Sequence, residues 1–352
     1  MTDLPSRNST GGGRITQLDG IRALAVTSVF VHHAFKIKLL WMGVDLFFVL
    51  SGFLITGILL DNRQKTFRSY IGQFYQRRAV RILPPYVLLL LVTALLFGTT
   101  WLRHWYLYLF LMNLVRILGV SQPDSIVLLW SLAVEEQFYI VWPFLVYVLN
   151  RKRLVAMAIG IIVLAPFLRW VCTPYLHNIW PIYFLTPFRM DALATGALLA
   201  VAWQKFRPRM KAYGQYGLAL SLGGALLLYS CSRITGFSTY SNTPLSNLVI
   251  FDCTLMICTG IMLWALSGKG VWILTLPPIV YLGRISYSVY LIHSTALVAA
   301  GWYWKPGAAA FVAAIGTIVY ATLSWYLIEK RLLDGSPAKK DLVRNSVALE
   351  AQ

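Results

Sequence analysis

Residues 18–33 read LDGIRALAVTSVFVHH, and residues 44–60 read VDLFFVLSGFLITGILL. Both stretches are mostly apolar, and with their flanks each approaches the roughly 20 residues that a helix needs to cross a bilayer. They also carry ionisable side chains, namely Arg22, His32, His33 and Asp45. Because a charge within a membrane span is costly, the two stretches predict a membrane protein and also the position of its functional site.

The composition of the whole chain agrees with a membrane protein. Of its 352 residues, 58% are hydrophobic and 12% are charged, whereas a soluble domain has about 25% charged residues. This excludes a soluble enzyme, a disordered chain and a disulfide scaffold. The four Cys show no metal-binding spacing, so we expect no metal site. The net charge of +18 comes from basic residues between apolar runs, which favours membrane lipids over nucleic acid as partners.

Hydropathy predicts an all-α integral membrane bundle of about ten transmembrane helices. Of the 31 Lys and Arg, 21 fall in connections on the side of the N-terminus, 6 on the other side and 4 within spans. By the positive-inside rule, both termini are therefore cytoplasmic. Residues 1–17 form a polar tail without a signal peptide, residues 18–332 the membrane domain, and residues 333–352 a second cytoplasmic tail. The predicted spans are 20–39, 44–60, 82–98, 126–149, 154–173, 182–203, 214–231, 247–266, 280–301 and 307–328.

The first span predicts a general base. Arg22 and His33 are eleven residues apart, so they share a helix face and are separated by about 16 Å along the axis. Asp45 follows a short turn and should lie at a similar depth, where its carboxylate could orient the imidazole of His33. In the alternative interpretation, Arg22 extends to the lipid headgroups and the histidine bonds a neighbouring helix.

Two further polar clusters are candidates. Arg78 and Arg81 share one helix face at the inner membrane boundary and could clamp a phosphate, although they could also be ordinary positive-inside charges. The fourth span contains Glu135 and Glu136, of which at least one must meet a cation or a water-filled cavity. We include Glu136 with His33 and Asp45 in the candidate catalytic set, but the spacing does not decide between the two acids.

Other polar residues within spans are expected to be structural. We interpret Arg189, Asp191, Asp252 and the segment from Gly283 to His293 as structural pairs rather than catalytic groups. Cys172 and Cys231 are expected to be free thiols. Aromatic residues at 99–125, such as Trp101, Trp105 and Tyr106, and the polar loop 232–246 could contact a sugar. An ordinary interfacial aromatic belt explains the rings equally well.

These motifs, in this order, resemble the acyltransferase-3 family of membrane O-acyltransferases, which acylate bacterial surface saccharides and some macrolides. The resemblance covers about residues 18–332. It implies that Arg22 and His33 are the family's basic residue and histidine of the first span, and that Arg78 and Arg81 are its paired arginines. Many relatives add an extracytoplasmic esterase-like domain, and we expect this chain to act without one. The resemblance rests on Leu18–Val26, Asp45–Phe53, Arg78 with Arg81, Trp130–Pro143 and Ser286–His293.

The resemblance implies transfer of an acyl group, most often acetyl, from acyl-CoA to a hydroxyl, with no permanently bound cofactor. Arg22, Arg78 and Arg81 would hold the acyl-CoA on the cytoplasmic side of the bacterial inner membrane. The acceptor would be a saccharide or lipid-linked glycan such as an exopolysaccharide or O-antigen, and polysaccharide-biosynthesis machinery is an expected partner. Three alternatives remain: a macrolide or other small hydroxylated acceptor, a proton-coupled transporter, and a non-catalytic partner of a flippase.

Overall fold

A computed structural model describes residues 15–115, 117–120, 123–233, 237 and 241–335, and these residues are helical, with no strand among them. Each of the ten predicted spans coincides with a long helix. Shorter helices α4 (Met112–Val115), α7 (Trp180–Phe184) and α13 (Lys330–Gly335) join or follow them. The long helices are α1 (Gln17–Phe35), α2 (Gly43–Asp61), α3 (Phe67–Phe97), α5 (Leu129–Val148), α6 (Arg151–Cys172), α8 (Met190–Tyr213), α9 (Gly217–Ser232), α10 (Pro244–Ser267), α11 (Pro277–Gly301) and α12 (Pro306–Ser324).

Within the described residues, six helical segments are long and apolar enough to cross a membrane: those containing α2, α3, α5, α6, α10 and α12. The helices α1, α8, α9 and α11 make up the remaining predicted spans. The number of ten crossings therefore stays a prediction, while the helical class of the fold is confirmed.

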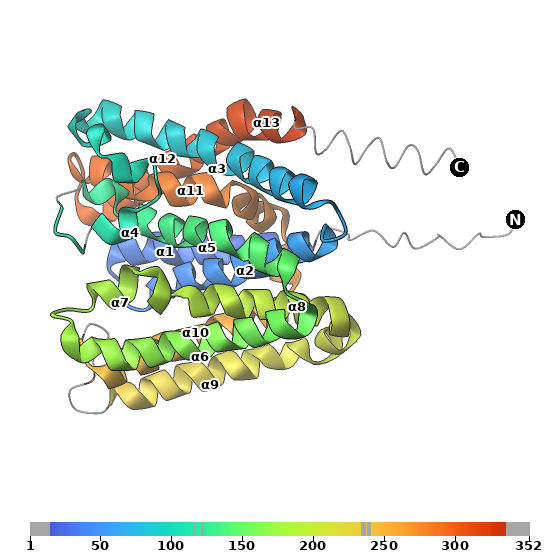
Figure 1. The fold of residues 1–352 in the computed structure, drawn as a ribbon. Helices are drawn as coiled ribbons and strands as arrows, with labels where there is room; N and C mark the ends of the chain where they lie inside the picture. The colour runs from blue at the N-terminus through green and yellow to red at the C-terminus, as the bar shows by residue number, and fades with distance from the viewer. Residues whose placement is uncertain (1–14, 116, 121–122, 234–236, 238–240, 336–352) are drawn as a thin grey trace, which may run out of the picture.

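The two ends of the bundle differ. The start of α1 and helix α13 lie at the same end (Figure 1). We call it the basic end because the α2–α3 connection there carries Arg63 and Lys65, and α6 begins there with Arg151–Arg153. The opposite end carries α4 and α7, and we call it the loop-rich end. An even number of crossings is consistent with this arrangement, and the cytoplasmic location of the basic end stays a prediction. Most of the predicted tails, 1–17 and 333–352, lies outside the described residues.

Helices α2 and α8 pack at unusually short distance because two glycines face each other. A Cβ atom on Gly52 would lie 1.9 Å from the carbonyl oxygen of Leu193, and one on Gly196 would lie 2.0 Å from that of Val49. Small residues permit such close backbone contact between membrane helices. The close crossing fixes the rotation of both helices about their axes.

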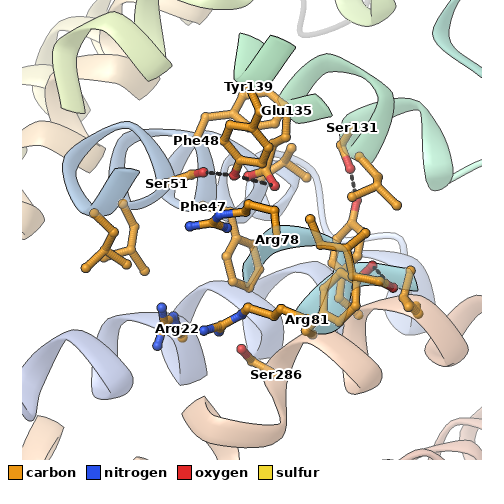
Figure 2. Close-up of a pocket in the computed structure, with 18 residues that line it drawn as sticks. Arg22, Phe47, Phe48, Ser51, Arg78, Arg81, Ser131, Glu135, Tyr139 and Ser286 are labelled. Carbon is orange, nitrogen blue, oxygen red and sulfur yellow. Dashed lines mark hydrogen bonds between the residues drawn. The ribbon is translucent and has the colours of Figure 1, made fainter. Parts of the chain in front are cut away.

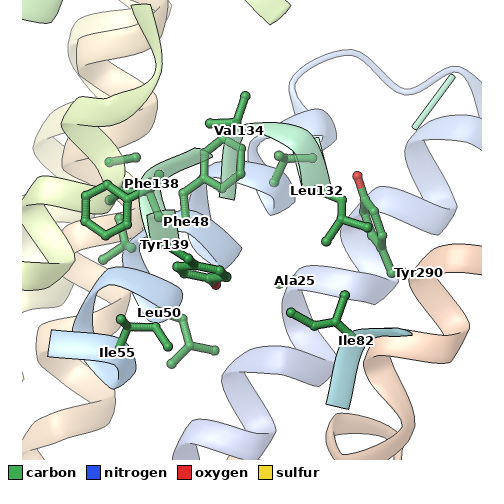
Figure 3. Close-up of a cluster of buried hydrophobic side chains, with 14 of the residues drawn as sticks. Ala25, Phe48, Leu50, Ile55, Ile82, Leu132, Val134, Phe138, Tyr139 and Tyr290 are labelled. Atoms are coloured by element: carbon green, nitrogen blue, oxygen red, sulfur yellow. The ribbon is translucent and has the colours of Figure 1, made fainter. Parts of the chain in front are cut away.

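The core beside this crossing is aromatic and aliphatic. Phe48 of α2 and Phe138 of α5 are buried there, and Ile82, Leu132 and Tyr290 extend the cluster towards α3 and α11 (Figure 3). Four of these side chains, those of Phe48, Ile82, Leu132 and Tyr290, also line the cavity described in the next section.

Buried charges pair between the helices, as expected. Arg169 of α6 contacts Asp191 at 2.8 Å and Asp252 at 2.6 Å. Cys172 and Cys231 are free thiols, which is also as expected. In the segment 99–125, Trp101 and Tyr106 are buried, whereas Trp105 remains 64% exposed. Part of the loop 232–246 lies outside the described residues.

Candidate active site

Three arginines line a cavity of about 120 Å³ inside the bundle, which we call the inner cavity. Arg22 extends from α1, and Arg78 and Arg81 extend from one face of α3 into the same space (Figure 2). Neither Arg78 nor Arg81 forms an ion pair or hydrogen bond with another described residue. The structure therefore brings together the three residues that the sequence proposed for holding the donor.

The opposite wall of the inner cavity carries an acid and two hydroxyls. The hydroxyl of Tyr139 donates to Glu135 Oε2 at 3.3 Å and is also hydrogen-bonded to Ser51 (Figure 2). The guanidinium carbon of Arg78 lies 5.0 Å from the centre of the Tyr139 ring. Guanidinium, phenol and carboxylic acid thus form one polar cluster.

Glu135, rather than the predicted Glu136, is the acid at this site. Successive residues of a helix point about 100° apart, so only one of the two can face the cavity. Glu136 does not line the inner cavity, and its buried Oε1 has no hydrogen-bond partner among the described residues. The inner cavity is thus lined by Glu135 and not by Glu136, and a catalytic role for either acid stays a prediction.

A second cavity of about 690 Å³, the outer cavity, opens towards the loop-rich end. His33 lines it, as do the polar or charged residues His32, Lys36, Asp124 and Ser294. The remaining wall is aliphatic and aromatic, and its aromatic residues are Trp41, Trp130, Trp180, Tyr183, Phe184, Phe251, Tyr290 and Trp304. A cavity with aromatic walls and a few polar groups fits a ligand that has both apolar faces and hydroxyls.

The inner and outer cavities meet at two residues, Val44 and Tyr290, which line both. The Tyr290 hydroxyl is hydrogen-bonded to Ser131 Oγ at 2.5 Å and donates to the carbonyl oxygen of Leu128 at 3.3 Å. A group moving between the cavities would pass the Tyr290 side chain. Arg22 and His33, which share a face of α1, thus serve the two cavities on either side of this contact.

His33 is hydrogen-bonded to a second histidine, His293 of α11. Nδ1 of His293 lies 2.6 Å from the carbonyl oxygen of Tyr290, and its Nε2 lies 3.2 Å from Nδ1 of His33. His33 Nδ1 also lies 2.9 Å from the carbonyl oxygen of Val29.

These contacts assign the tautomers of both neutral rings. A carbonyl oxygen can only accept, so Nδ1 carries the hydrogen in His293 and in His33. Nε2 of His293 is then an acceptor for His33 Nδ1–H. The unprotonated nitrogen of His33 is its Nε2, as a general base requires.

The predicted pair of His33 with Asp45 is not formed. Asp45 is buried and pairs instead with Arg189, the N-cap residue of α8, and it accepts a hydrogen bond from Thr254 at 3.1 Å. Asp45 precedes Gly52 by seven residues, almost two helical turns, so both occupy the face of α2 that contacts α8. Arg189 precedes Gly196 by the same interval. The close α2–α8 crossing therefore directs Asp45 towards Arg189 and away from α1.

His293 and Tyr290 are the site residues that sequence reasoning placed among structural groups. A signal for them existed in the spacing of Ser286, Tyr290 and His293, which are four and three residues apart and so share one helix face. Ser286 and Tyr290 line the inner cavity, and His293 continues the stripe to His33.

The comparison with protein families decides the classification. An acyltransferase domain model, acyltransferase family 3, matches residues 15–330. The chain belongs to the acyltransferase-3 family. The family and the six apolar helical segments together indicate an integral membrane protein.

Relatives of this acyltransferase-3 chain include the peptidoglycan O-acetyltransferase OatA of Listeria monocytogenes, which is 29% identical over 79% of the chain. YrhL of Bacillus subtilis, provisionally named a peptidoglycan O-acetyltransferase, is 28% identical over 90% of the chain. A Staphylococcus aureus protein provisionally named an O-acetyltransferase is also 28% identical over 90%. The chain spans 49%, 54% and 56% of these relatives' lengths, respectively. No solved structure matches it.

Proposed function

We propose that this protein is a membrane O-acyltransferase that moves an acetyl group from acyl-CoA on the cytoplasmic side to a hydroxyl of a surface saccharide. The observation that carries the proposal is the junction of two unlike cavities at Tyr290, one lined by arginines and the other by aromatic rings and His33. Guanidinium groups recognise phosphates, and aromatic walls suit the apolar faces of sugar rings.

The donor occupies the arginine side in this proposal. Arg78 and Arg81 have no carboxylate partner among the described residues, so their charges are available to the phosphates of coenzyme A. Arg22 and His33 are about 16 Å apart along α1, a separation that an extended pantetheine arm can bridge. The thioester then reaches His33 past Tyr290 while the nucleotide stays near the basic end.

The chemical step uses His33 as a general base. Its Nε2 takes the proton of the acceptor hydroxyl as that oxygen attacks the thioester carbonyl carbon. The carbon–sulfur bond breaks, and the coenzyme A thiolate takes up the proton from the imidazolium. The products are an O-acetyl ester and free coenzyme A. In this step His293 is a positioning residue that holds His33 Nδ1–H, the role that the sequence had given to Asp45.

The acceptor is proposed to be a glycan of the peptidoglycan type. Relatives named as peptidoglycan O-acetyltransferases support this choice, as does the size of the outer cavity, about 690 Å³. A macrolide or other small hydroxylated metabolite is the alternative acceptor. Association with polysaccharide-biosynthesis machinery in the bacterial inner membrane remains part of the proposal.

Proteoliposomes of known orientation test the proposal. Acetyl-CoA is supplied on the side of the basic end and glycan fragments on the other side, and products are analysed by mass spectrometry. We expect O-acetylated glycan only with this arrangement, and none with His33→Ala. Transfer with both substrates confined to the side of the basic end would refute the opposed-side mechanism and would favour a soluble small-molecule acceptor.

A further inference from the structure

A third cavity, of about 240 Å³, lies at the basic end and shares Arg22, Arg81 and Tyr287 with the inner cavity. We call it the mouth cavity. Its remaining wall consists of Arg284 of α11, Trp325, Glu329, Leu333 and Asp19, which is ion-paired with Arg22 at 2.9 Å. The mouth, inner and outer cavities therefore follow one another through the bundle, each sharing residues with the next.

The proposed function assigns no role to Arg284, which lines the mouth cavity. It is exposed, although it lies within a long helix of a membrane protein. The acid Glu329 lines the same cavity but forms no ion pair with Arg284 among the described residues, and its Oε1 accepts hydrogen bonds from Ser288 at 2.6 Å and Ser324 at 2.8 Å. Arg284 forms no ion pair or hydrogen bond with another described residue. An arginine that lines a cavity without a carboxylate partner is available to an anion.

The backbone places Arg284 at this position. A Cβ atom on Gly283 would lie 1.9 Å from the carbonyl oxygen of Asp19, so α11 contacts the start of α1 directly at this point. Arg284, the next residue, lines the mouth cavity together with Arg22, which is three residues beyond Asp19. The presence of both arginines in one cavity wall follows from this contact between two helices.

The other side of the mouth cavity has an unusual backbone. Residues Trp325–Glu329 form a π-helical turn between α12 and α13. Such turns are rare and frequently occur at functional sites. This one begins with Trp325, which is half-buried and lines the mouth cavity. The cavity thus combines guanidiniums with a flat aromatic surface.

We propose that the mouth cavity binds the adenosine 3′-phosphate end of the acyl-CoA, with Arg284 contacting phosphate and Trp325 stacking on the adenine. This inference rests on the proposed function and extends it to two residues outside the predicted clamp. Arg81, which also lines the inner cavity, would then contact the pyrophosphate beside the ion pair of Arg22 with Asp19. The order along the ligand is adenosine in the mouth cavity, pantetheine in the inner cavity and thioester near His33.

Two probes test the inference: CoA, and 4′-phosphopantetheine, which lacks the 3′-phosphoadenosine and one phosphate of the pyrophosphate. The affinities of CoA and 4′-phosphopantetheine are measured for the full chain in phosphatidylcholine nanodiscs. In Arg284→Gln we expect CoA to bind about tenfold more weakly, as for loss of one charge-assisted contact, and 4′-phosphopantetheine to bind as it does to the wild type. Trp325→Leu should show the same selectivity. Arg331→Ala is the matched control, because Arg331 is exposed on α13 nearby and does not line the mouth cavity.

An anionic lipid headgroup offers the same phosphate chemistry, so the nanodisc experiment is repeated with phosphatidylglycerol added. If Arg284→Gln loses bound phosphatidylglycerol in native mass spectrometry but keeps wild-type affinity for CoA, the site binds lipid and the inference is refuted. Equal weakening of CoA and 4′-phosphopantetheine would also refute it. If the wild type binds neither probe, the proposed donor is wrong and both proposals fall together.

Discussion

Replacing His293 tests the histidine pair more sharply than replacing His33 itself. His33 Nδ1–H has two acceptors, the Val29 carbonyl oxygen at 2.9 Å and His293 Nε2 at 3.2 Å. His293→Phe removes only the hydrogen bond to His293 Nε2 and leaves the one to the Val29 carbonyl oxygen. A neutral hydrogen bond contributes about 0.5 to 1.5 kcal/mol, which corresponds to roughly a 2- to 12-fold effect. Loss of a general base costs about 100- to 10,000-fold. We therefore expect the kcat of His293→Phe to fall about tenfold, far less than that of His33→Ala.

His293→Gln provides the matched comparison. Its amide oxygen can accept from His33 Nδ1–H, so kcat should recover towards the wild-type value. The assay follows labelled acetyl transfer from acetyl-CoA to glycan fragments in proteoliposomes, with thermal unfolding as a check on folding. The KM for acetyl-CoA should stay constant, because His293 lies beyond the inner cavity. The positioning role of His293 is refuted if His293→Phe and His293→Gln lower kcat equally, or if only the KM changes.

Three further outcomes are expected from the same structure. His33→Ala should abolish transfer while His32→Ala has a mild effect, because only His33 contacts His293; equal losses in the transfer assay would contradict this. Asp45→Ala should lower the free energy of unfolding by about 3 to 5 kcal/mol, because it leaves the buried Arg189 unpaired. Asp252→Ala should lower it less, because the Asp252 side chain is 38% exposed. If unfolding experiments gave the reverse order, the Asp45–Arg189 pair would not be the stabilising one. Arg78→Ala or Arg81→Ala should weaken CoA binding, measured by calorimetry, by about 1.5 to 3 kcal/mol. Arg68→Ala should have no effect, because Arg68 is exposed and does not line the inner cavity. If neither Arg78→Ala nor Arg81→Ala changed the affinity for CoA, the predicted clamp would be refuted.

The sequence by itself determined the local features of the protein. Apolar runs of nearly bilayer length place the ten long helices, because each helix satisfies its own backbone hydrogen bonds. The intervals of eleven residues between Arg22 and His33, and of three between Arg78 and Arg81, fix shared helix faces through the 3.6-residue period. The structure accordingly places the predicted arginines together in one cavity.

Only the tertiary structure decided which side chains pair across helices. Asp45 and Arg189 are 144 residues apart, and His33 and His293 are 260 residues apart. Such pairs depend on which helices are neighbours and on how each is rotated, and the α2–α8 contact at Gly52 and Gly196 sets that rotation for Asp45. A helix period states that two residues share a face, but it does not state which neighbour that face meets. For the same reason the choice between Glu135 and Glu136, and the position of His293 beside His33, required the packed bundle.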